Sequence, residues 1–402
     1  MPAPNSLLVT AIVTALVGFG AISTDLYLPS LPAIAGHFRA ETGAAQLTLS
    51  VFLVGFAVSQ LVYGPLSDRF GRRPVLVGGL LIFTAASTAC ALADSLAMLI
   101  VARFFQALGA CAGPVLGRAI VRDIYGREQA ARVMSYISTA MALAPALGPI
   151  LGGVIQDWLG WRANFGALVA IGMIALLAVL AALPETNRWR DPAATGPARL
   201  FGNYVGLLAD PLYRGYVLIC ALAYAGLFAF ISGSSFVLIE TLGLTPLQFG
   251  LCFASMVTGY MAGTFTSARL TLRLGLERLV AAGAWAGCIG GALGTGFTLA
   301  GLVTLPTLLA PVFLFALGAG LMLPNAIAGA IGPFPEKAGS ASALLGFLQM
   351  LLASLVGIGV GQFHDGSGRS MTLAIAAMGL GAMLCTWRLA RLRAAAPGAA
   401  TS

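Results

Sequence analysis

Long apolar stretches separated by short polar turns run along the whole chain. Dividing it at charged and turn residues leaves twelve apolar stretches, each close to the roughly 20 residues that an α-helix needs to cross a bilayer. They fall at residues 7–30, 45–66, 75–93, 97–120, 133–156, 163–183, 213–236, 247–268, 279–298, 304–327, 339–362 and 371–390. The pattern predicts an all-α polytopic membrane protein with twelve transmembrane helices.

The longest polar interruption follows the sixth stretch and divides the chain into halves. We expect an N-terminal six-helix half at 1–183, a linker at 184–212, a C-terminal six-helix half at 213–393 and a tail at 394–402. The tripeptide Arg69-Phe70-Gly71 after the second stretch has a counterpart, Arg273-Leu274-Gly275, after the eighth. Two related halves of six helices are typical of secondary transporters.

Composition excludes several other classes of protein. Hydrophobic residues make up 59% of the 402 residues and charged residues 9%, which is too few to cover a soluble domain. The net charge of +8 comes from short basic clusters and forms no basic face, so we expect no nucleic-acid partner. The six cysteines stand singly and predict neither a metal site nor disulfides. A phosphate-binding G-x-x-x-x-G-K-[ST] string is absent, so ATP is not the predicted energy source.

Arginine and lysine indicate the orientation. Seventeen of the 22 basic residues fall on one side of the predicted spans, whereas only Arg39, Arg162 and Arg369 fall on the other. Because cytoplasmic loops carry the excess of basic residues, both termini and the linker are predicted to be cytoplasmic, in a bacterial inner membrane.

The turn between the second and third spans has a specific sequence, Gly64-Pro65-Leu66-Ser67-Asp68-Arg69-Phe70-Gly71-Arg72-Arg73-Pro74. Glycines permit a tight turn, and Asp68 can pair with arginine or cap a helix. We therefore expect a cytoplasmic gate here, to which Asp123 adds a contact with Arg69, Arg72 or Arg73. For Arg118, Arg122 and Asp123 together, a plain basic anchor is the alternative.

Charged residues inside the apolar stretches are functional candidates because burying them in a membrane is costly. Asp25 lies about 27 Å along the first helix from Leu7, and Arg103 lies about 9 Å inside the outer end of the fourth. The two are predicted to share one depth and one cavity, with Gln106 beside Arg103. Pro29 and Pro32 predict a distortion of the helix near Asp25. The alternatives are an interfacial position for Asp25 and a snorkelling anchor for Arg103.

Four strings together resemble a known family. The 64–74 turn closely resembles the signature loop of the major facilitator superfamily, and residues 144–153, Ala-Pro-Ala-Leu-Gly-Pro-Ile-Leu-Gly-Gly, resemble the motif of its drug:proton antiporters. With 25–32 (Asp-Leu-Tyr-Leu-Pro-Ser-Leu-Pro) and 103–109 (Arg-Phe-Phe-Gln-Ala-Leu-Gly), the chain resembles the Bcr/CflA subfamily, named for bicyclomycin and chloramphenicol resistance. The diagnostic strings all lie in the first 160 residues.

The resemblance implies a proton-coupled antiporter that exports amphipathic drugs by alternating access, as a monomer and without a cofactor other than the proton. Asp25 is implied as the proton carrier, and one proton per cycle is expected. The implied role of the fifth helix is to keep the two open states apart without a proton leak, through Pro145, Gly148, Pro149, Gly152 and Gly153. Ordinary packing of small residues is the alternative there.

The drug-binding surface is the least specific prediction. Its candidates are aromatic residues with two amides, which suit broad selectivity: Tyr27, Phe52, Phe56, Tyr136, Tyr224, Phe228, Phe236, Tyr260, Asn325, Phe347 and Gln349. For each aromatic residue, lipid contact or core packing is the alternative. The rival functions are export of an endogenous metabolite by the same machinery, a passive facilitator, and a membrane enzyme. The enzyme would need clustered catalytic groups, and His37 and His364 are the only histidines.

Overall fold

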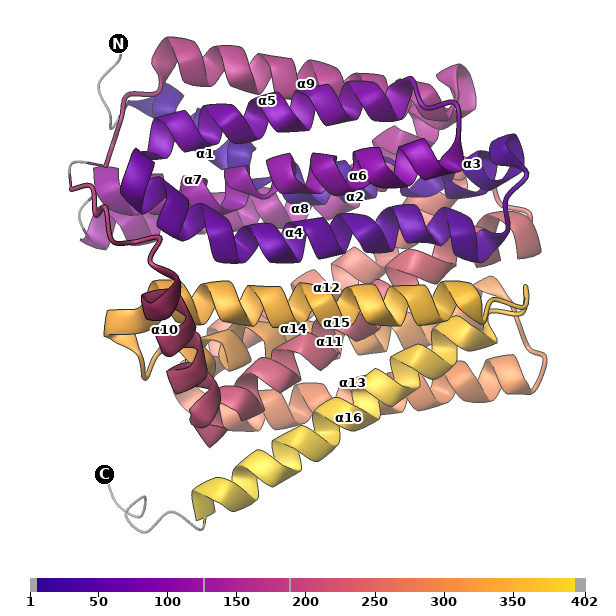
Figure 1. The fold of residues 1–402 in the computed structure, drawn as a ribbon. Helices are drawn as coiled ribbons and strands as arrows, with labels where there is room; N and C mark the ends of the chain where they lie inside the picture. The colour runs from indigo at the N-terminus through magenta and orange to yellow at the C-terminus, as the bar shows by residue number, and fades with distance from the viewer. Residues whose placement is uncertain (1–5, 126, 188, 395–402) are drawn as a thin grey trace. The chain divides into compact units, whose positions relative to one another are not determined.

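Helices account for nearly all of the structure. The computed structural model describes residues 6–125, 127–187 and 189–394, although the side chains of 127–132, 134–143, 197–199 and 394 lie outside this description. Within these residues there is no strand (Figure 1). The helices are α1 (Leu7–Val17), α2 (Phe19–Asp25), η1 (Leu28–Ser30), α3 (Leu31–Phe38), α4 (Thr42–Phe70), α5 (Arg72–Ala91), α6 (Leu96–Ala110), α7 (Ala112–Ile124), α8 (Arg127–Leu159), α9 (Trp161–Ala182), α10 (Pro197–Ala209), α11 (Pro211–Ser235), η2 (Phe236–Thr241), α12 (Pro246–Leu274), α13 (Leu276–Leu299), α14 (Leu305–Ile331), η3 (Pro335–Lys337), α15 (Ala338–Gln362) and α16 (Arg369–Ala394).

These helices supply the twelve predicted spans. Among the described residues, nine are long and apolar enough to cross a membrane, and the bent pair formed by α1 with α2–α3 makes a tenth. The remaining two predicted spans correspond to α8 and α12, which are 33 and 29 residues long. The sequence prediction of an all-α membrane fold is therefore confirmed, with helix ends that shift by a few residues.

The first span differs from its prediction because it is not one continuous helix. It bends by 43° at Gly18 and continues to Phe38, eight residues beyond the predicted end. At the bend, α7 approaches so closely that a Cβ on Gly113 would lie 2.1 Å from the carbonyl oxygen of Leu16. The distortion predicted from the prolines is confirmed, since Pro29 lies in the 3₁₀ turn η1.

The chain forms two compact units. The first comprises residues 1–200 together with Leu244–Ala254, and the second comprises Phe201–Gly243 and Ser255–Ser402. Each is held by close backbone approaches at small residues. In the first, a Cβ on Gly109 would lie 2.4 Å from the backbone nitrogen of Phe83, and in the second, one on Gly263 would lie 2.1 Å from the carbonyl oxygen of Leu317.

The repeated tripeptide has the same structural role in both units. Gly71 and Gly275 each stand at the N-terminal cap of a helix with positive φ, 102° before α5 and 80° before α13. This conformation favours glycine. The similarity is therefore one of backbone geometry as well as of sequence.

The linker contains a helix that the sequence pattern did not predict. α10 occupies 13 residues of the predicted linker. Within it Leu200, Tyr204 and Leu207 follow a helical spacing. Asp210 then caps the next helix by accepting hydrogen bonds from the backbone N–H groups of Leu212 and Tyr213, both at 2.8 Å.

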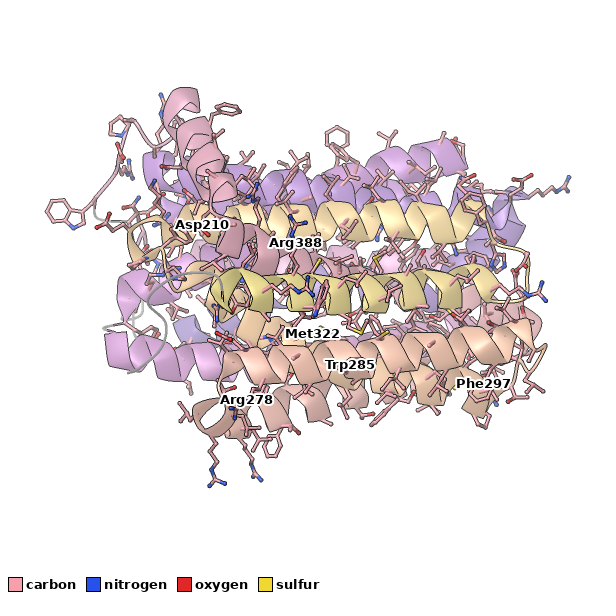
Figure 2. The ribbon with its side chains drawn as sticks, turned by 90° about the horizontal axis from the view of Figure 1, so that it is seen from below. Asp210, Arg278, Trp285, Phe297, Met322 and Arg388 are labelled. Carbon is pink, nitrogen blue, oxygen red and sulfur yellow. The ribbon has the colours of Figure 1, made fainter. Side chains whose placement is uncertain are left out.

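Large apolar side chains cover the outside of the long helices, as expected for a surface in contact with lipid. Trp285 on α13, for example, is 59% exposed (Figure 2). The two units thus keep an apolar exterior along their spans.

Candidate functional site

A fully buried arginine lies at the centre of the first unit. Arg103 on α6 has 0% exposure, so it is not a snorkelling anchor. Its Nη1 donates to the carbonyl oxygen of Ser23 on α2 at 3.0 Å and to Oε1 of Gln106 at 2.6 Å. Its Nε donates to the carbonyl oxygen of Thr48 on α4 at 3.4 Å. Arg103 therefore joins three helices, mainly through backbone acceptors.

Aromatic rings complete the surroundings of this guanidinium. Its central carbon lies 4.4 Å from the ring centroid of Tyr27 and 4.2 Å from that of Phe52, within the range of cation–π attraction. The hydroxyl of Tyr27 is hydrogen-bonded to Thr48. Nη2 of Arg103 has no hydrogen-bond partner among the described residues. Within the described part of the chain, the guanidinium thus has two aromatic neighbours and one nitrogen, Nη2, without a partner.

Gln106 extends the polar cluster to a fourth helix. Its Nε2 donates to the hydroxyl of Ser87 on α5 at 2.7 Å, and Ser87 in turn donates to the carbonyl oxygen of Phe83. Both Gln106 and Ser87 are fully buried. Because its Nε2 is bound to Ser87, the side chain of Gln106 is held with Oε1 toward Arg103.

Asp25 is the last residue of α2 and is also buried, with 5% exposure, which excludes an exposed interfacial position. No hydrogen bond or ion pair joins its carboxyl group to another residue in the described part of the chain. It faces α8, where a Cβ on Gly148 would lie 2.7 Å from Cβ of Asp25. A buried carboxyl group without a partner is unusual, because burial removes hydration that nothing replaces.

The structure brings Asp25 and Arg103 to one level of the unit but does not pair their charges. Arg103 bonds to the backbone of Ser23, two residues before Asp25, so the two residues lie at a similar level along the helices. Among the described residues, no ion pair links the two side chains. The two side chains, on α2 and α6, thus lie at one level of the unit with separate surroundings.

The small residues of α8 allow it to lie directly on the distorted part of the first span. A Cβ on Gly152 would lie 1.9 Å from the carbonyl oxygen of Leu26, and Pro145 and Pro149 stand inside the same helix. Gly153 faces the backbone of Pro246, in the part of α12 that belongs to this unit.

Polar side chains hold η1 against the neighbouring helices. The hydroxyl of Ser30 donates to Oε1 of Gln156 on α8 at 2.6 Å and accepts from Nδ2 of Asn164 on α9 at 2.8 Å. Asn164 also donates to the carbonyl oxygen of Gly152 at 3.2 Å. The helix distortion next to Asp25 is thus anchored on both sides.

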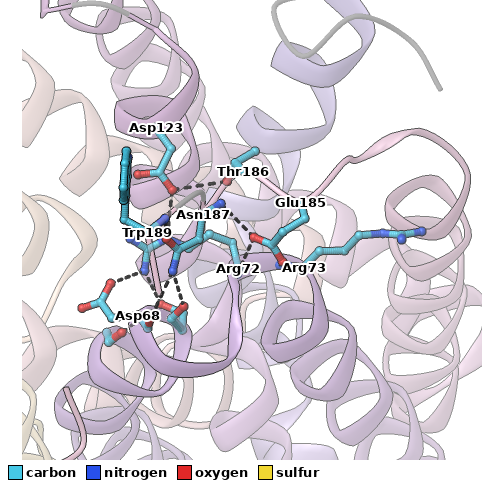
Figure 3. A network of polar contacts seen from close by, with 10 residues as sticks. Asp68, Arg72, Arg73, Asp123, Glu185, Thr186, Asn187 and Trp189 are labelled. Atoms are coloured by element: carbon cyan, nitrogen blue, oxygen red, sulfur yellow. Dashed lines mark hydrogen bonds and ion pairs between the residues drawn. The ribbon is translucent and has the colours of Figure 1, made fainter. Parts of the chain in front are cut away.

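The turn between α4 and α5 forms a polar network at one end of the unit (Figure 3). Arg72 pairs with Asp68, with 2.5 Å between Nη1 and Oδ1, and with Asp123 at the end of α7, with 2.9 Å between Nε and Oδ2. Among the three arginines considered as partners of Asp123, Arg72 therefore makes the contact. The network joins α4, α5 and α7.

The linker supplies three side chains to this network that the sequence reasoning missed. Glu185 accepts from the backbone N–H groups of Arg72 at 2.9 Å and Arg73 at 3.2 Å, so it caps α5. Asn187 donates to the carbonyl oxygens of Ser67 and Asp68, both at 3.1 Å, at the end of α4. We call residues 185–191 the strap.

The third of these linker side chains, Thr186, donates to Oδ2 of Asp123 at 3.2 Å. The backbone N–H of Asp191 also donates to the carbonyl oxygen of Asp68 at 3.1 Å. Gly71 makes room for the strap, since a Cβ there would lie 2.5 Å from Oε2 of Glu185. The only indication of the strap in the sequence was an acidic residue and an amide residue, Glu185 and Asn187, directly after the sixth predicted span.

Other residues of the predicted gate make separate contacts. Nη1 of Arg69 donates to Thr195 at 2.7 Å, and Nη2 of Arg73 donates to the carbonyl oxygen of Leu180 at 2.8 Å. Arg118 donates to the carbonyl oxygen of Pro114 within α7 at 2.8 Å. Gly64 lies inside α4, where a Cβ would meet nothing within 4 Å, and Arg122 is exposed. In the part of the chain that the structure describes, no hydrogen bond or ion pair joins the side chains of these five residues to the Arg72 pairs.

The predicted drug-surface residues divide between the units. Tyr27 and Phe52 lie against Arg103, and the ring of Phe56 stacks on that of Phe52 with 6.2 Å between the ring centroids. In the second unit Phe228 and Phe236 are buried, whereas Tyr224, Tyr260, Phe347 and Gln349 are partly exposed. Nδ2 of buried Asn325 donates to Ser267 at 2.7 Å. The side chain of Tyr136 lies outside the described residues.

Two hollows of the structure lie away from this predicted surface. An open groove of about 650 Å³ lies on the outside of α5 and α6, with Ile82, Ala89 and Phe105 among its lining residues. A smaller hollow lies between α13, α14 and α16. Neither is lined by a predicted drug-surface residue.

Among the described residues, no group of three or more histidine, cysteine, aspartate or glutamate side chains could hold a metal ion.

Comparison with known proteins decides the family. The model of the Major Facilitator Superfamily matches residues 10–357 of the chain. The chain belongs to the major facilitator superfamily. It is therefore a multi-pass membrane transporter and not an enzyme.

Three curated relatives of this transporter carry informative names. Multidrug resistance protein D of Escherichia coli is 32% identical, with 93% of this chain and 94% of the relative covered. The chloramphenicol resistance protein of Pseudomonas aeruginosa is 33% identical over 84% and 81%. The bicyclomycin resistance protein homolog of Haemophilus influenzae is 28% identical over 87% of each. The resemblance to the Bcr/CflA subfamily is thereby confirmed.

A solved structure agrees on the fold. The crystal structure of a D-xylose-proton symporter matches with a TM-score of 0.73 and 18% identity, covering 96% of this chain and 98% of the other. At that identity the likeness concerns the fold alone.

Proposed function

We propose that this transporter exports drugs or other small amphipathic compounds in exchange for protons across the bacterial inner membrane. The names of the relatives, which refer to multidrug, chloramphenicol and bicyclomycin resistance, support the substrate class. The structural observation that carries the proton part is the buried carboxyl group of Asp25, which has no partner among the residues that the structure describes.

Asp25 suits a proton carrier for a physical reason. Without a countercharge or hydrogen bond, a buried carboxyl group loses more hydration as an anion than as a neutral acid. An arriving cation or polar substrate changes that balance, so substrate and proton can replace each other. Arg103 holds the backbone of Ser23 and Thr48 and is itself oriented by Gln106. Its Nη2, which has no partner among the described residues, is available to a polar group of the substrate.

Alternating access requires the two halves to exchange between two arrangements. In this proposal the Asp68–Arg72–Asp123 network is a gate at the cytoplasmic side. The small residues of α8 keep the two open states apart without a proton leak. One carboxyl carrier gives one proton per cycle. Because Asp25 and Arg103 come from one chain, a monomer suffices.

The test is substrate-induced proton movement in proteoliposomes, wild type beside Asp25→Asn, with phenicols, bicyclomycin-like compounds and cationic dyes. We expect the wild type to exchange protons for at least one compound, and Asp25→Asn to bind that compound without exchange. Equal coupling by Asp25→Asn would place the proton site elsewhere. A wild type that moves no protons with any compound would contradict the drug assignment and favour an endogenous metabolite.

A further inference from the structure

The linker helix α10 presents an apolar face that its own unit does not cover. Phe201, Val205 and Leu208 are 71%, 49% and 38% exposed, and their spacing places them on one side of the helix. Leu207 faces the protein instead and is 1% exposed. The helix is thus docked by one face and leaves a second apolar face outward.

The direction of α10 suits a membrane surface. Figures 1 and 2 show it running crosswise to α13 and α14 of the same unit. Asp210, at the corner between α10 and α11, caps α11 through its two hydrogen bonds and fixes this change of direction. Because α11 crosses the membrane, a helix crosswise to the spans at its end lies in the plane of the bilayer surface.

Positive charge accompanies the apolar face. Nζ of Lys337, the one lysine of the chain, lies 3.9 Å from the Cβ position of Gly206 on α10. Arg214 is exposed one turn beyond Asp210. An apolar face beside basic side chains is the combination that attracts an amphipathic helix to anionic lipids.

We infer that α10 is an interfacial anchor that inserts Phe201, Val205 and Leu208 among the lipids and binds anionic phospholipid headgroups through Lys337. The occupant is lipid because exposed apolar side chains stand beside basic ones on a helix that runs crosswise to the spans at the end of one of them. This inference goes beyond the transport function and does not depend on it.

The experiment places a nitroxide spin label at residue 201, 205 or 208, in a variant whose six cysteines are replaced by alanine. The labelled protein is reconstituted in phosphatidylglycerol vesicles, and collisions with oxygen are compared with collisions with a water-soluble nickel chelate. We expect oxygen to dominate at all three positions. A label at Ala193, exposed in the same linker, is the matched control and should favour nickel.

The charge part is tested with the same labels. Replacing phosphatidylglycerol by phosphatidylcholine, or Lys337 by glutamine, should lower the oxygen preference, and Lys337→Arg should restore it. Labels at 201, 205 and 208 that favour nickel as the control does would overturn the anchor. Insertion that is indifferent to lipid charge and to Lys337→Gln would overturn the headgroup site. Dipolar broadening between labels on different copies would show that a second copy covers the face instead.

Discussion

Arg103 shows how one side chain can be both structural and available for function. Its guanidinium reaches backbone oxygens of two other helices and lies against two aromatic rings, while Nη2 keeps no partner among the described residues. A planar guanidinium can serve several acceptors at fixed angles, whereas an ammonium group is a single point charge.

Arg103→Lys should therefore destabilise the protein although the charge is retained. Hydrogen bonds to charged groups contribute about 1.5–3 kcal/mol each, so the loss of one corresponds to about 2 kcal/mol and a clear fall in melting temperature in detergent. Transport should fall as well. Arg369→Lys, at the start of α16, is the control and should leave the melting temperature and transport unchanged. If Arg103→Lys were as stable as the wild type, the surroundings of Arg103 would not require the shape of a guanidinium.

Residues of the candidate site were predictable to different degrees. Asp25 and Arg103 stand out because charges are rare in apolar stretches, and helical rise gave their common depth. Their separate surroundings were not predictable, because the choice between a backbone oxygen and a carboxylate as partner depends on ångström-scale packing that residue spacing does not encode.

At the scale of elements, the irregular first span depends on its contact with α8. Gly152 faces the carbonyl oxygen of Leu26 at a distance that excludes any side chain. The small-residue motif therefore determines where the distorted segment after Asp25 can lie.

Gly152→Ala should push α8 away from this segment. Overpacking of this kind costs about 1–3 kcal/mol, so we expect a lower melting temperature and impaired proton exchange. Gly166→Ala on α9 is the matched control, because a Cβ there meets nothing within 4 Å and alanine favours a helix by about 0.5–1 kcal/mol. The close approach would be refuted by a Gly152→Ala protein as stable as the control.

The strap connects three elements through polar contacts at helix ends. Glu185→Ala removes the acceptor of two backbone N–H groups and a negative charge at the start of α5. The loss of a helix cap costs about 1 kcal/mol, so the thermal stability should decrease and proteolysis in the linker should become faster. Glu336→Ala, at an exposed position of η3, should have neither effect. If Glu185→Ala and Glu336→Ala had the same thermal stability and the same rate of proteolysis, the Glu185 cap would contribute nothing measurable to stability.

Over the whole molecule, the number of spans was predictable and the elements between them were not. Hydropathy gives spans because each must bury its own backbone polar groups in lipid. The break at Gly18 was not predicted, because a glycine in an apolar stretch does not by itself indicate a bend. The linker helix α10 was not predicted, because it is short and lies among prolines and glycines.

Orientation belongs to the same scale. The excess of arginine on one side predicts that the C-terminus and the strap are cytoplasmic. Alkaline phosphatase, which is active only outside the cytoplasm, should be inactive when fused after residue 402 and active when fused within the 363–368 loop. The opposite pattern of activity would reverse the proposed topology.

The strap has a consequence for how the first half can be made. It fastens the ends of α4, α5 and α7, yet its residues are synthesised after the last of the six spans. A separately expressed half that stops at Leu183 would contain every span but leave the N–H groups of Arg72 and Arg73 uncapped. One that continues through Asp191 would carry its own fastening. During synthesis, likewise, the contacts between the strap and the ends of α4, α5 and α7 can form only after the linker has left the ribosome. The residue at which the chain is cut therefore decides whether the N-terminal half contains all of these contacts.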